Sequence, residues 1–134
     1  MFSKKKQPPI KSLIADGTEV QGNLRFADGL RIDGNVTGDI LAAEGRGSLL
    51  VVSETATVTG SVRADHVIIN GRVKGPVFAA ELLELQPKAR IDGDVTYKAL
   101  EMHQGAVIFG LLKATDAAVQ AEEAPLLKLA ASKT

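Results

Sequence analysis

The feature that most constrains the fold of this 134-residue chain is a short unit that recurs along its middle: an aliphatic residue, any residue, glycine, any residue and a second aliphatic residue. Clear copies occupy residues 20–24, 32–36, 58–62, 69–73 and 91–95, and two of them run on into further copies at 36–40 and 73–77. A recurrence of this kind is typical of a repeat architecture. One glycine per repeat can be taken as equivalent, with successive steps of 16, 22, 15, 18 and 17 residues: Gly22, Gly38, Gly60, Gly75, Gly93 and Gly110.

Each unit alternates aliphatic and polar side chains with a period of two, which is the pattern of a short strand with one buried face. Helical spacing fits this region poorly. Val, Ile and Thr, which favour strands, dominate the units, and glycine, which is unfavourable inside a helix, recurs at nearly every helical turn. We therefore predict an all-β chain that forms a single β-solenoid of about six coils, roughly 29 Å long at about 4.8 Å per coil. The alternative is an antiparallel sandwich with glycine-rich turns, which the regular period disfavours.

The repeat also predicts which side chains fill the core. The long step of 22 residues contains the segment 42–48, which we interpret as a loop inserted into one coil. The candidates for one inward column of stacked aliphatic residues, or for neighbouring columns, are Val20, Val36, Val58, Val73, Ile91 and Val107.

The formal net charge of zero is the sum of unlike segments. Residues 1–12 carry four lysines and no acidic residue, 13–112 carry nine basic and thirteen acidic residues, and in 113–134 three of each cancel. All thirteen glycines lie between Gly17 and Gly110. We therefore divide the chain into a disordered basic arm (1–12), a β-helical domain (13–112) and a C-terminal tail that is disordered or partly helical (113–134).

Signatures of catalysis and of metal binding are scarce. The chain has no cysteine and two histidines, His66 and His103, which occupy different phases of the repeat, so a three-histidine zinc site cannot be built within one chain. Asp92 and Asp94 lie two residues apart, but short regular coils offer no cleft of the kind that acid–base catalysis needs. The calcium-binding nonapeptide and the phosphate-binding Gly-x-x-x-x-Gly-Lys-Ser/Thr motif are absent. We expect no catalytic, cofactor-binding or metal-binding site.

The two ends of a solenoid expose unpaired backbone groups that template further strands, and many solenoids cover them with a capping element. Here Pro8 and Pro9 oppose a capping helix before the domain, and the last coil ends in the apolar run 107–112. We predict that Val107, Phe109 and Leu111 contact another subunit. The alternatives are that Phe109 plugs the end of the core, and that residues 113–134 fold over the end as a cap.

The opening Met-Phe-Ser-Lys-Lys-Lys, the Val-x-Gly-x-Val coils and the short flanking tails resemble the bactofilins, a family of bacterial polymer-forming cytoskeletal proteins. The resemblance covers residues 13–112 and the opening hexapeptide. It implies a right-handed β-helix that assembles end to end, without nucleotide, into non-polar filaments. It also implies a location on the inner face of the cytoplasmic membrane, where such filaments scaffold cell-wall enzymes and shape-determining machinery. Phe109 matches the aromatic residue that family members often use in subunit contacts.

The basic arm is the predicted membrane-binding element, because each lysine adds about 1 kcal/mol of attraction to an anionic bilayer. One arm binds weakly, but a filament presents many arms at once. The alternative is a solvated tail, and nucleic-acid binding is disfavoured because the adjoining domain is net negative. The residues of this predicted site are Met1, Phe2, Lys4, Lys5 and Lys6.

A second function remains as an alternative to the scaffold, namely a small trimeric solenoid enzyme of the acyltransferase type with sites shared between chains. Such enzymes use a catalytic histidine, and the scarcity of histidine in this chain disfavours it.

Overall fold

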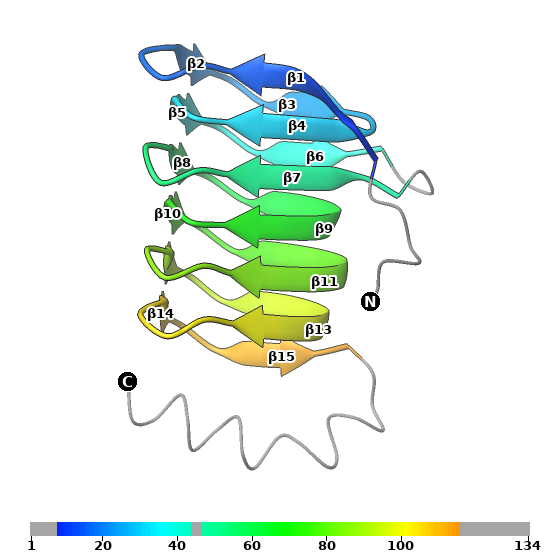
Figure 1. The fold of residues 1–134 in the computed structure, drawn as a ribbon, viewed down its shortest axis with the longest axis vertical. Helices are drawn as coiled ribbons and strands as arrows, with labels where there is room; N and C mark the ends of the chain where they lie inside the picture. Colours follow the sequence, from blue (N-terminus) through cyan, green and yellow to red (C-terminus); the bar gives the residue numbers. More distant parts are fainter. Residues whose placement is uncertain (1–7, 44–46, 116–134) are drawn as a thin grey trace.

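The computed structural model describes residues 8–43 and 47–115, and every regular element within these ranges is a strand. The strands wind around one axis and stack on three faces (Figure 1). The solenoid runs from β1 (Ile10–Ile14) to β15 (Leu112–Ala114).

The first face holds β3 (Leu24–Phe26), β6 (Ile40–Ala42), β15 and the N-terminal halves of β9 (Val62–Ile69), β11 (Val77–Leu85) and β13 (Val95–Met102). The second face holds β1, β4 (Gly29–Ile32), β7 (Leu49–Val52) and the C-terminal halves of β9, β11 and β13. The third face holds β2 (Glu19–Gln21), β5 (Asn35–Thr37), β8 (Thr57–Thr59), β10 (Arg72–Lys74), β12 (Arg90–Asp92) and β14 (Val107–Phe109).

The strand pairs show that the architecture is a solenoid. Each pair is parallel, and the partners come from successive coils. The third face is a sheet of six strands in the order β2, β5, β8, β10, β12, β14, which confirms six coils. An antiparallel sandwich is excluded, because its neighbouring strands would run in opposite directions.

The handedness follows from the path of the chain in Figure 1. The front strands β1, β4 and β7 run from right to left, and the chain returns behind them from left to right while it descends from the N-terminal to the C-terminal coil. This path is a right-handed winding, as the resemblance to the bactofilins implied.

The core is a set of aliphatic columns in which each residue lies directly above its equivalent in the next coil. On the third face the column begins at Val20 and passes through Val36, Val58, Val73 and Ile91, which confirms five members of the predicted column. All of these except the half-buried Val20 are at most 1% exposed. Burying each such side chain contributes about 1.5–3 kcal/mol relative to leaving it in water.

The sixth member of that column was predicted wrongly. Ile108, not Val107, pairs with Ile91, and Ile108 is buried while Val107 is half-buried on the outward side of β14. Three consecutive apolar residues make the alternation in β14 ambiguous. The position of Gly110, two residues after Ile108 as Gly93 is two after Ile91, resolves the register.

At the corner between the third and first faces, the six glycines taken as equivalent stack on one another. Gly60 and Gly75 have φ angles of +148° and +152°, a region that side-chain-bearing residues rarely adopt. A Cβ atom on Gly75 would overlap the backbone carbonyl of Gly60, and one on Gly60 would overlap the carbonyl of Gly38. The coils therefore touch backbone to backbone at this corner, which only glycine permits.

The predicted insertion lies between β6 and β7, which end at Ala42 and begin at Leu49, whereas β9, β11 and β13 continue without a break between the same two faces. After the insertion, the buried Ser48 restores the register with the next coil. Its hydroxyl accepts the backbone N–H of Asp65 at 3.0 Å, and its own N–H donates to an Asp65 carboxylate oxygen at 3.3 Å. The interruption is thus confined to one corner of one coil.

The glycine stack yields a test of the fold. We predict that Gly60→Ala lowers the free energy of unfolding by at least about 2 kcal/mol, because the methyl group meets a backbone carbonyl that side-chain motion cannot remove. Gly22→Ala is the matched control, since Gly22 has φ +129° but no atom within 4 Å of its Cβ position. Urea unfolding followed by circular dichroism measures both, and an equal loss in the two variants would contradict the stacking.

Candidate polymer interface at the ends of the solenoid

Both ends of the solenoid have open strand edges. At the N-terminal end β1, β2 and β3 each pair with a strand on one side only, and at the C-terminal end β14 and β15 do the same. Within residues 8–43 and 47–115, the outer N–H and C=O groups of such strands have no ladder partner, and groups of this kind can accept a strand from another molecule.

The exposed large hydrophobic side chains of the described residues lie in the same two coils. Ile10 and Leu13 on β1 are 43% and 58% exposed. Met102, Phe109 and Leu111 in the last coil are 42%, 59% and 62% exposed. The four intervening coils present no such side chain within the part of the chain that the structure describes, so the apolar surface is concentrated where the strand edges are open.

Phe109 lies on the outward side of β14 together with Val107. It is in register with Asp92 and borders a groove of about 220 Å³ that Arg72, Lys74 and Arg90 also line. Phe109 does not plug the core, because the buried Ile108 occupies that position. Its ring is left available for contact with a second molecule.

Leu111, the third residue of the predicted interface, is held in place by the preceding coil. Its backbone N–H donates to the Asp94 carboxylate at 3.0 Å. The same contact joins earlier coils, where Asn23 accepts from the N–H of Asp39 and Asp39 accepts from that of Ser61, both at 2.9 Å. Asp94 therefore has a structural role at the corner.

Asp33 occupies the corner between the second and third faces, next to Ser53 of the following coil. The hydrogen bond from the Ser53 hydroxyl and the neighbouring Arg31 guanidinium, whose Nε donates at 2.8 Å, hold the pKa of Asp33 below its ordinary value. A carboxylate that stays ionised at neutral pH is poorly suited to act as a general acid. Asp33 is thus another stabilising corner residue.

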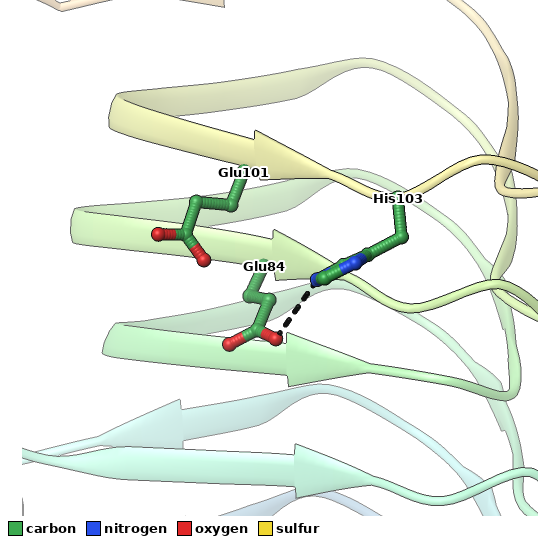
Figure 2. A group of neighbouring side chains, drawn as sticks. All are labelled: Glu84, Glu101 and His103. Carbon is green, nitrogen blue, oxygen red and sulfur yellow. Dashed lines mark hydrogen bonds and ion pairs between the residues drawn. The ribbon is translucent and has the colours of Figure 1, made fainter.

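The two histidines lie at different positions of the repeat, as expected. His66 and Ala99 are both in register with Leu82, whereas His103 follows the end of β13. His103 lies beside Glu84 and Glu101 in a group of potential metal ligands (Figure 2). A comparison of the two histidines with each other does not reveal this group. The signal was available in the spacing of 17 residues between the glutamates, which is one coil.

The predicted membrane-binding residues Met1, Phe2, Lys4, Lys5 and Lys6 lie outside the described residues, as does the tail from residue 116 onward. In the ranges 8–43 and 47–115, no helix is long and apolar enough to cross a bilayer.

Comparisons with known proteins point to one family. Residues 12–113 match the model of the bactofilin family, described as polymer-forming cytoskeletal. The chain is 26% identical over 109 residues to bactofilin BacO of Myxococcus xanthus (strain DK1622), covering 81% of this chain and 83% of the relative. The fold is similar to that of the cytoskeletal bactofilin BacA solved by solid-state NMR, with a TM-score of 0.66 and 32% identity over 78% of this chain and 95% of that one.

A six-coil parallel solenoid with open, apolar ends agrees with a family model that matches almost the whole of that solenoid. The chain belongs to the bactofilin family of polymer-forming cytoskeletal proteins.

Proposed function

We propose that this protein assembles end to end, without nucleotide, into filaments that lie on the inner face of the cytoplasmic membrane and act as a scaffold. The observation that carries the end-to-end contact is the coincidence of open strand edges with exposed large hydrophobics in the first and last coils. The four intervening coils offer neither feature in the described residues.

The energy of the contact comes from two sources. Burying a phenylalanine or leucine side chain contributes about 1.5–3 kcal/mol, and Phe109 and Leu111 are each more than half exposed in the isolated chain. Strand edges that meet add backbone hydrogen bonds at about 1 kcal/mol each. Neither source needs nucleotide hydrolysis. The sequence, which has no Gly-x-x-x-x-Gly-Lys-Ser/Thr motif, agrees with this.

The membrane contact is assigned to the basic arm. Lys4, Lys5 and Lys6 are attracted to anionic lipids, and Phe2 inserts among the headgroups. Each arm alone binds weakly and reversibly, whereas a filament holds many arms at one surface and gains avidity of several orders of magnitude. Polymerisation and membrane binding are therefore coupled in this proposal.

The scaffold has no catalytic activity of its own, and it organises the machinery of cell shape and cell-wall synthesis. The cytoskeletal description of the family supports a structural role of this kind. The non-polar arrangement, in which like ends meet, follows the resemblance to the bactofilins.

Phe109→Arg tests the polymer interface. We expect soluble monomers or dimers, because the variant loses the free energy of about 2 kcal/mol that burial of the phenylalanine side chain contributes to the subunit contact. A loss of this size raises the critical concentration for polymerisation about 30-fold. High-speed pelleting without added nucleotide, followed by negative-stain electron microscopy, measures the change.

The matched control is Asp92→Arg, since Asp92 is the in-register neighbour of Phe109 one coil inward and is also exposed on the outward side. The control is expected to form filaments. Unchanged filaments in Phe109→Arg, with both variants folded by circular dichroism, would refute the interface.

Replacement of Lys4, Lys5 and Lys6 by Ser tests the membrane contact. The variant is expected to form normal filaments that no longer float with liposomes containing phosphatidylglycerol, because the attraction of about 3 kcal/mol per arm is lost. Replacement of Lys74, Lys88 and Lys98 by Ser removes the same charge from the solenoid away from the open terminal strands and is expected to preserve flotation. Retained flotation of the arm variant would overturn the assignment.

A further inference from the structure

Three potential metal ligands converge on the second face near the C-terminal end of the solenoid. Glu84 on β11 and Glu101 on β13 are register partners, so their side chains project side by side from adjacent coils. His103 follows β13, and its ring turns back toward Glu84, with Nε2 3.2 Å from the carboxylate oxygen Oε2 (Figure 2).

The charges of this group are not balanced by a permanent cation. Elsewhere on the solenoid a lysine pairs with a glutamate: Lys98 with Glu81 at 3.8 Å and Lys88 with Glu54 at 3.1 Å. Among the described residues, no lysine or arginine forms an ion pair with Glu84 or Glu101. Like charges directly opposite each other on neighbouring strands are destabilising, so the site favours an added cation.

The geometry is close to that of a metal site. One ligand atom from each of the three side chains lies within 4.8 Å of the others. Bonds of about 2.0–2.2 Å to nitrogen and oxygen require ligand atoms roughly 3.4 Å apart in a tetrahedral arrangement. Rotation of Glu101, which is exposed and forms no hydrogen bond within the described part of the chain, can close the difference. Glu84 is already oriented, because Gln86 Nε2 donates to its Oε2 at 3.4 Å.

We propose that Glu84, Glu101 and His103 bind a divalent transition-metal ion of the zinc type. Nε2 of His103 and one carboxylate oxygen from each glutamate are the protein ligands, and water completes the coordination. The imidazole ligand selects zinc, nickel or copper over magnesium and calcium, which prefer oxygen-only ligand sets. The ion replaces the His103–Glu84 hydrogen bond and neutralises the paired carboxylates.

The position of the site gives the ion a structural consequence. Glu84 belongs to the fifth coil, and Glu101 and His103 belong to the sixth. A bound metal ion therefore cross-links β11 to β13, the last strand of the second face. The backbone N–H of His103 also donates to the carbonyl of Leu85 at 2.8 Å, which anchors the ligand loop to the same coil. We expect zinc to slow amide hydrogen exchange in residues 99–109.

Calorimetric titration of the full-length chain with Zn²⁺ tests the proposal, with Co²⁺ absorption as a readout of a nitrogen-containing ligand set. His103→Ala and Glu101→Gln are expected to weaken Zn²⁺ binding at least tenfold and to abolish the slowed exchange. Both positions are on the surface, so both variants are expected to fold, which circular dichroism checks.

The control is His66→Ala, because His66 and His103 are the two histidines of the chain and His66 lies at another position of the repeat. This variant is expected to bind Zn²⁺ as the unaltered protein does. Equal binding by His103→Ala, or competition by Mg²⁺ as effective as Zn²⁺ itself, would show only general attraction of cations to acidic residues and would overturn the proposal.

Discussion

The backbone-to-backbone contact of successive coils at the glycine corner is the constraint on which the rest of the structure depends. Where the carbonyl of one glycine lies against the α-carbon of the next, as between Gly60 and Gly75, the coils come close enough to hydrogen bond in register along all three faces. That register places each aliphatic residue above its equivalent and so builds the core columns. It also aligns each corner carboxylate with a backbone N–H group of the next coil, from which the carboxylate accepts a hydrogen bond.

The same stacking has no natural end. In the part of the chain that the structure describes, each inner coil is hydrogen bonded to a coil on both sides, whereas the first and last coils are bonded on one side only and carry exposed apolar side chains. A fold whose stability comes from adding coils gains further stability by adding another molecule, and this explains why a polymer-forming family uses a parallel solenoid. The charge is also segregated, because residues 1–12 carry four lysines and no acidic residue whereas 13–112 are net negative. Under the proposed function, this segregation separates the arm that contacts lipid from the solenoid that assembles.

Much of the fold could be predicted because every coil repeats the same physical problem. The glycine steps identified equivalent positions in successive coils, which the structure stacks at one corner, and the units around Val36, Val58 and Val73 identified the core column. The register of the last coil could not be predicted from Val107, Ile108 and Phe109 alone. All three are apolar, so their polarity does not show which side chains face the core. The Glu84–Glu101–His103 group was not predicted either, because its members become neighbours only when β11 and β13 pair in the register that the structure shows.

The most direct test of end-to-end assembly is the axial rise per subunit of the filament, measured by cryo-electron microscopy or by diffraction from aligned filaments. Six coils at about 4.8 Å each predict an axial rise of about 29 Å per subunit, with the 4.8 Å strand spacing directed along the filament axis. A strand spacing perpendicular to the filament axis, or a rise per subunit well below about 29 Å, would mean that the solenoids associate through their sides, and would contradict assembly through the open terminal coils.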